Sequence, residues 1–271
     1  MKTLRRGWFQ LFVGGLILLC LVEWALFVTH NPNYFPSAIL LGAFLVPVTF
    51  VSYLYERLPN WGVSLRALVI CFVWGGILGT VVAGVLEYNL ARRLGFLPTL
   101  GIGLSEEAAK LIVPLVFYFL GRYRSEAAGI VLGVASGMGF AAFETMGYGF
   151  VSLLQSGGNL AFVDFVLLLR GLISPAGHAS WTGLVCAVLW RERLEAGHAV
   201  LTWRVGGAFL TAVTLHALWD TFASNRGDVL FEILGLDLLS LLVALVSLTL
   251  LIRRVREAQR VGVQSPIASS A

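Results

Sequence analysis

Long uninterrupted apolar runs constrain this chain more than any other feature of its sequence. Hydrophobic residues make up 58% of the 271 residues and charged residues only 13%, whereas a soluble domain carries about 25% charged residues. The runs have the length that an α-helix needs to cross about 30 Å of hydrocarbon at about 1.5 Å per residue. They are too continuous for the short alternating strands of an outer-membrane barrel. The sequence therefore predicts an all-α, polytopic transmembrane helical bundle.

The predicted bundle is a single domain over residues 1–256, with a motif-bearing core at 97–225 and a disordered cytoplasmic tail at 257–271. Leu160–Ile173 is apolar but short for a span, so we expect a re-entrant or interfacial segment there. Ser174 and Pro175 after it are typical of a helix start. About eight spans are expected, at residues 7–29, 36–56, 63–90, 97–120, 126–154, 174–190, 199–224 and 229–252.

The arginines set the expected orientation. With eight spans, only Arg92, Arg93 and Arg226, together with Arg170, fall away from the more basic side. By the positive-inside rule, both termini are then cytoplasmic. The net charge of +4 is explained by these short clusters between apolar runs. We therefore expect a lipid bilayer around the chain and no nucleic-acid partner.

Charged side chains within the fourth expected span point to function, because each costs about 2.5–3.5 kcal/mol to insert in a membrane. Lys110 follows Glu106 by four residues and Glu107 by three. All three side chains can therefore share one side of a helix and form ion pairs. Pro114 cannot donate to the carbonyl of Lys110, which leaves that oxygen free at the same place. Two adjacent carboxylates exceed what a structural ion pair requires.

The fifth expected span carries a ridge of small residues that leads to a carboxylate. Gly129, Gly133 and Gly137 are spaced by four residues, a pattern that lets another helix approach closely. Glu144 comes seven residues after Gly137, so it lies on nearly the same helix face. We expect Glu144 to face a neighbouring helix and not lipid.

Two histidines complete the set of intramembrane ionisable groups. His178 lies near the start of the sixth expected span, and His216 shares a helix face with Asp220 in the seventh. A lone membrane histidine is as often a hydrogen-bonding group between helices as a catalytic one. In the eight-span topology, however, Glu106, Glu144 and His216 all lie about 12–15 Å below the outer surface. The sequence thus predicts that these groups meet at one site.

This combination of residues suits hydrolysis. One glutamate can act as a general base toward water, and the choice between Glu106 and Glu107 stays open. Two histidines and a glutamate also form a catalytic zinc set with one open position, so Glu144, His178 and His216 are the candidate ligands and Zn²⁺ the candidate ion. A metal-free mechanism stays open, with the oxyanion stabilised by His and Asp groups. The full set of candidate catalytic residues is Glu106, Glu107, Lys110, Glu144, His178, His216 and Asp220.

Four motifs follow one another over residues 100–225: Glu106-Glu107-x-x-Lys110, Phe140-x-x-x-Glu144, an Arg170…His178 segment and His216-x-x-x-Asp220. In order and spacing they resemble the PrsW family of intramembrane proteases, which is similar to the broader CAAX-protease and bacteriocin-processing superfamily. The resemblance implies an endopeptidase of the bacterial cytoplasmic (inner) membrane. It implies single-pass membrane proteins as substrates, with anti-sigma factors as the best-known type. Thr145 departs from the family, which often has Asn there.

Two other classes of function remain open. Intramembrane carboxylates and histidines also build the proton relays of ion-coupled transporters, although the inverted repeat typical of transporters is not found. A binding or immunity protein of the same fold, without catalysis, is the second alternative. Glu23 and Glu87 belong to none of the motifs.

Overall fold

The structure is a computed structural model that describes residues 6–57, 62–91, 98–223 and 238–264. Every regular element in these ranges is helical, and no strand occurs among them. The all-α prediction is therefore confirmed for the described residues. The elements are α1 (Gly7–Thr29), η2 (Pro32–Tyr34), α2 (Phe35–Arg57), α3 (Leu65–Ala91), α4 (Pro98–Lys110), α5 (Ile112–Leu120), α6 (Glu126–Gln155), α7 (Leu160–Ile173), η4 (Pro175–Ala179), α8 (Ser180–Ala196), α9 (Trp203–Ala223) and α11 (Leu238–Gln264).

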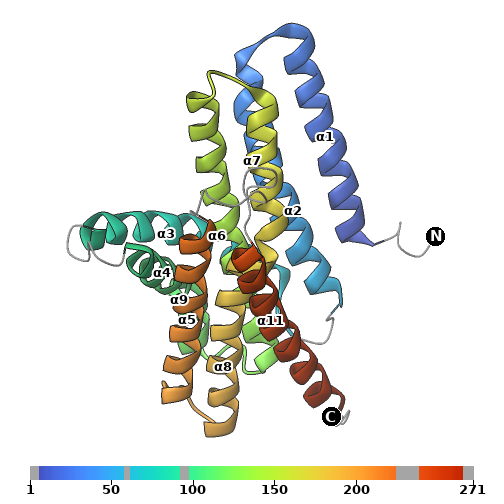
Figure 1. The fold of residues 1–271 in the computed structure, drawn as a ribbon. Coiled ribbons are helices and arrows are strands. Elements are labelled where there is room, and N and C mark those ends of the chain that lie inside the picture. The colour runs from blue at the N-terminus through green and yellow to red at the C-terminus, as the bar shows by residue number, and fades with distance from the viewer. Residues whose placement is uncertain (1–5, 58–61, 92–97, 224–237, 265–271) are drawn as a thin grey trace.

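Helix α6 forms the centre of the bundle. It contacts α2, α3, α7 and α8, and it is buried without interruption from Glu126 to Ala142. In Figure 1, α7 and α8 follow one another along the bundle beside α6, whereas α3 lies across it. Helix α1 packs mainly on α2 and leaves most of its apolar surface exposed.

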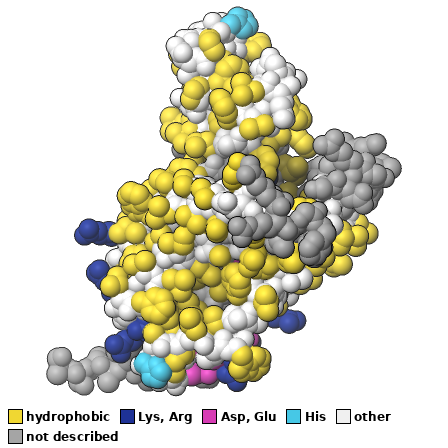
Figure 2. Space-filling model, turned by 90° about the vertical axis from the view of Figure 1, so that its left-hand side faces the viewer, with side chains coloured by type: hydrophobic (Ala, Val, Ile, Leu, Met, Phe, Trp, Pro, Cys, Tyr) yellow, Lys and Arg dark blue, Asp and Glu magenta, His cyan; other side chains and the backbone are white. Residues whose placement is uncertain are grey.

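Six of the described helical segments are long and apolar enough to cross a membrane. Figure 2 shows apolar side chains over most of one face, with the charged side chains gathered in its lower half. The expected count of about eight spans is not confirmed. The expected spans 97–120 and 199–224 correspond to α4 with α5 and to α9, which are not among the six. The six are Gly7–Thr29, Pro32–Arg57, Leu65–Leu90, Glu126–Gln155, Leu160–Ala196 and Leu238–Arg260.

Leu160–Ile173 is not a separate re-entrant segment, which corrects the sequence-based expectation. It is the first part of a helical stretch of 37 residues, Leu160–Ala196, which passes through the π-helical turn η4. Ser174 is correspondingly no helix N-cap, because its hydroxyl donates to the carbonyl of Arg170 at 2.6 Å. Pro175 has no N–H to donate to the preceding turn, and a π-turn accommodates this defect without ending the helix.

The predicted glycine ridge of α6 packs closely against η4 and α8. A Cβ on Gly129 would lie 2.6 Å from the Trp190 ring, and one on Gly137 would overlap the carbonyl oxygen of His178. Such distances require backbone-to-side-chain and backbone-to-backbone contact between the helices. The ridge is confirmed, and its last glycine fixes the main chain at His178.

The C-terminal helix extends further than expected. Helix α11 continues to Gln264 and so includes residues 257–264 of the expected tail. Glu257 lies 3.2 Å from Arg254 on the same helix and 2.9 Å from Arg191 of α8, so ion pairs join this part of α11 to α8. Residues 265–271 and the expected start of the last span, 229–237, lie outside the described residues.

Candidate active site

An ion-pair cluster on α4 forms the floor of the site. The ammonium Nζ of Lys110 lies 2.9 Å from Oε2 of Glu106 and 2.7 Å from Oε1 of Glu107. All three residues are buried, and Lys110 is completely inaccessible. The pairing predicted from the i+3 and i+4 spacing is therefore present.

The break between α4 and α5 anchors this cluster to α6. The helix is interrupted at Leu111, within one turn of Pro114. The Lys110 carbonyl, which Pro114 cannot pair, accepts a hydrogen bond of 2.6 Å from the Ser136 hydroxyl of α6. The sequence predicted the free carbonyl but not its partner, because nothing in the sequence indicates which side chain lies opposite.

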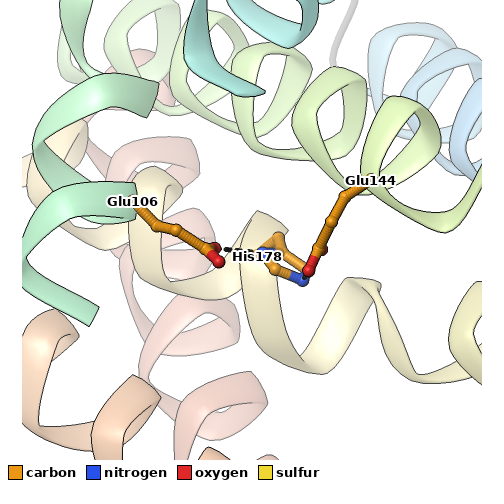
Figure 3. A group of neighbouring side chains, drawn as sticks. All are labelled: Glu106, Glu144 and His178. Atoms are coloured by element: carbon orange, nitrogen blue, oxygen red, sulfur yellow. Dashed lines mark ion pairs between the residues drawn. The ribbon is translucent and has the colours of Figure 1, made fainter. Parts of the chain in front are cut away.

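His178 links α4 to α6. Its Nδ1 lies 2.8 Å from the Lys110 ammonium, and its Nε2 lies 3.3 Å from Oε2 of Glu144. An ammonium has no acceptor lone pair, so Nδ1 accepts and the ring proton of neutral His178 is on Nε2, directed at Glu144. In Figure 3 the imidazole lies between the carboxylates of Glu106 and Glu144, which approach from two other helices.

Glu144 is also paired with a cation from α7. Its Oε2 lies 2.8 Å from Nη2 of Arg170, whose guanidinium lies 3.8 Å from the centre of the Tyr148 ring. The motif that resembles the PrsW family included Arg170, but the candidate catalytic set did not. The continuous helix through η4 is what brings Arg170 and His178 to the same carboxylate.

His216 of α9 is surrounded by carboxylates. Its Nδ1 lies 2.9 Å from Oε1 of Glu107, and its Nε2 lies 3.6 Å from Glu106 and 3.5 Å from Asp220. The predicted shared face of His216 and Asp220 is thus present. Because Glu107 contacts both Lys110 and His216, it joins α4 to α9 behind the reactive face of the site.

Trp181, which belongs to none of the four motifs, packs against both histidines. Its ring stacks on His216 at 4.4 Å between centroids and meets the edge of His178 at 5.5 Å. Its Nε1 donates to the Ser247 hydroxyl of α11 at 2.9 Å. The last helix therefore supports the site through one buried tryptophan.

A cavity of about 830 Å³ opens beside the cluster and is lined by α3, α4, α6, α7, η4 and α9. Its wall includes Glu106, but neither Glu107 nor Lys110. The structure thus separates two adjacent glutamates that the sequence alone could not distinguish. The other predicted residues on the wall are Glu144, His178, His216 and Asp220.

A divalent cation fits the donors at the centre of this wall. Glu106, Glu144 and His178 each offer one ligand atom, and these atoms lie within 4.8 Å of one another. Two carboxylates and one imidazole suit Zn²⁺ and leave a position open. This set differs from the expected Glu144, His178 and His216, because His216 is held by Glu107.

Lys110 places one condition on such a metal. If His178 ligated through Nε2, its ring proton would have to be on Nδ1, which then could not accept from the Lys110 ammonium. A neutral His178 ring therefore cannot bind a metal through Nε2 while its Nδ1 accepts a hydrogen bond from the Lys110 ammonium, 2.8 Å away.

Membrane-length helices around a buried cluster of glutamates and histidines define a polytopic membrane protein with a hydrolase-type site. The profile of the PrsW family intramembrane metalloproteases matches residues 63–251. The chain belongs to this family and is a multi-pass intramembrane protease. No curated protein and no solved structure shows a significant match to it. The family predicted from the motifs is thereby confirmed, and α1 and α2 lie outside the matched residues.

Proposed function

We propose that this protease is an endopeptidase that cleaves single-pass membrane proteins within the bilayer, with proteins like anti-sigma factors as the substrate type. The observation that carries the proposal is the convergence of Glu106, Glu144 and His178 from three helices on one cavity. A volume of about 830 Å³ lies within the range of about 300–1,000 Å³ that is usual for ligand pockets. It suits a short extended stretch of peptide.

Glu106 is the general base in the metal-free form of this mechanism. Its carboxylate is on the cavity wall, 2.9 Å from the Lys110 ammonium, where it can accept a proton from a water molecule in the cavity. The same group then delivers the proton to the leaving amine. Glu107 acts as a positioning residue, since it contacts Lys110 and His216 and does not reach the cavity.

The developing oxyanion is stabilised by donors from η4 and α9. His178 and His216 both line the cavity, and the Nε2–H of His178, 3.3 Å from Oε2 of Glu144, would turn from that carboxylate to the oxyanion. Asp220 orients His216, and Arg170 orients the Glu144 carboxylate.

A bound divalent cation, with Zn²⁺ as the expected ion, would be held by Glu106, Glu144 and His178. It would supply Lewis-acid polarisation of the scissile carbonyl and a more acidic water. In that form Lys110 would lose its contact with His178 and stay paired with Glu106 and Glu107, while His216 and Asp220 would face the peptide from the cavity wall.

We place the protein in the bacterial cytoplasmic membrane with both termini cytoplasmic. The support is the distribution of arginines along the chain and the resemblance of its motifs to a bacterial family.

The test is cleavage of tagged single-pass substrates in reconstituted vesicles. Wild type is compared with Glu106→Gln and with Glu23→Gln, a matched change at an α1 carboxylate that is not on the cavity wall. We expect cleavage to be lost in Glu106→Gln and kept in Glu23→Gln. Equal cleavage by both variants would refute the assigned base. Ion flux that depends on Glu106, without cleavage of any substrate, would favour a transporter.

A further inference from the structure

Glu87 of α3 is a cavity carboxylate to which neither the motifs nor the mechanism gives a role. It is half-buried on the cavity wall, where it interacts electrostatically with the like charges of Glu106 and Glu144 and, more weakly, with His216 and Lys110. It forms no ion pair or hydrogen bond with any residue in the described part of the chain. An intramembrane carboxylate without a partner is costly and marks a functional position.

Among the described residues, the cavity wall offers Glu87 no cation in direct contact. Four carboxylates are on the wall, and Arg170 is the permanent cation among its residues, already paired with Glu144. Lys110, behind the wall, is shared between Glu106 and Glu107. A metal at Glu106, Glu144 and His178 would neutralise that group and still leave Glu87 unpaired. As far as residues 6–57, 62–91, 98–223 and 238–264 define it, the wall is therefore complementary to one more positive charge.

The surface of α3 next to Glu87 is shaped for a long side chain. Thr80, Ala83, Gly84 and Glu87 follow the i, i+3, i+4, i+7 pattern, and all four line the cavity. A Cβ on Gly84 would meet no atom within 4 Å, so space remains open one turn before Glu87. Three small residues thus form a trough that ends at a carboxylate. A flexible aliphatic stem with a cationic head fills such a trough, whereas a small inorganic cation would leave it empty.

We propose that Glu87 binds a lysine or arginine side chain of the substrate and so selects substrates with a basic residue beside the cleaved bond. This inference rests on the proposed endopeptidase function. Glu87 is in this role a specificity-determining residue, since its carboxylate reaches the substrate side chain and not the scissile carbonyl.

The test uses single-pass model substrates that share one apolar span and carry Lys, Gln or Glu at a single position. This position is moved one residue at a time along the substrate on both sides of the cleaved bond. We expect wild type to cleave the best Lys substrate about tenfold or more faster than its Gln counterpart, because an ion pair near a protein surface has this scale. Glu87→Gln should lower that ratio to about one, and Glu87→Lys should reverse the preference toward the Glu substrate. Glu23→Gln is the matched control and should keep the wild-type ratio.

The inference would be overturned if Glu87→Gln kept the wild-type ratio of Lys to Gln cleavage rates, or if wild type showed no preference for Lys. The protease function would stand in both cases. Binding of the Lys and Gln substrates to Glu106→Gln gives a second measurement that needs no catalysis. We expect tighter binding of the Lys substrate, and loss of that difference in the Glu87→Gln, Glu106→Gln double variant. If no substrate is cleaved by wild type, the proposed function fails, and the binding difference still decides whether Glu87 is a cation subsite.

Discussion

Replacement of Gly137 by alanine tests whether close helix contact positions His178. The new Cβ would overlap the His178 carbonyl oxygen and lie 2.9 Å from its carbon. The two backbones must separate by about 1 Å to restore ordinary van der Waals contact. Because His178 holds both Lys110 and Glu144 within 3.3 Å, a shift of that size disturbs both contacts.

The expected effect is large on activity and small on stability. A displacement of about 1 Å at a catalytic group can lower the rate about 100-fold. Overpacking costs about 1–3 kcal/mol, but replacing glycine by alanine within a helix returns about 1 kcal/mol. Gly137→Ala should therefore fold, with a modestly lower midpoint of thermal unfolding, and cleave about 100-fold more slowly.

The assay is the initial rate of substrate cleavage in vesicles at equal amounts of folded protein. Gly206→Ala of α9 is the matched control, because a Cβ there meets no atom within 4 Å and the residue is not on the cavity wall. It should cleave at the wild-type rate. Wild-type cleavage by Gly137→Ala would show that the close approach of α6 and η4 does not position His178.

Three further changes probe the floor of the site and its metal. Lys110→Met leaves two buried carboxylates without their cation, and it should lower the free energy of unfolding by about 3–5 kcal/mol, seen as a loss of folded protein in detergent. Ser136→Ala removes the hydrogen-bond donor to the buried Lys110 carbonyl and should lower the free energy of unfolding by about 1–3 kcal/mol. An unchanged midpoint of thermal unfolding would contradict the assigned hydrogen bond. Chelation should abolish cleavage and added Zn²⁺ restore it if Glu106, Glu144 and His178 hold a metal, whereas full activity in metal-free protein would support the glutamate mechanism.

Local spacing made part of the site predictable. The pairing of Lys110 with Glu106 and Glu107 and the shared face of His216 and Asp220 follow from helix periodicity alone. The ridge that ends at Gly137 was predictable for the same reason. In each case the residues concerned lie within two turns of one helix, where geometry is fixed by the backbone.

Contacts between helices were beyond such reasoning. The sequence could not show that Lys110 reaches His178, that Ser136 caps the Lys110 carbonyl or that Trp181 stacks on His216. Helix rotation and approach decide these contacts, and they depend on packing over the whole bundle. The expected break before His178 is wrong, because Ser174 and Pro175 lie within a continuous helical stretch and do not begin a new helix. A π-turn has no sequence pattern of comparable strength.

The π-turn η4 also sets the angular phase between the two halves of its helix. Arg170 and His178 are eight positions apart, and at 3.6 residues per turn such positions point about 80° away from each other. A π-turn takes up about one extra residue without advancing the helix, so the two side chains return to within about 20° of a common direction. This phase shift lets one carboxylate, Glu144, contact both of them. A regular α-helix through Pro175–Ala179 at unchanged chain length would turn the two side chains back to about 80° from each other, so the π-turn is as much a part of the site as the residues themselves.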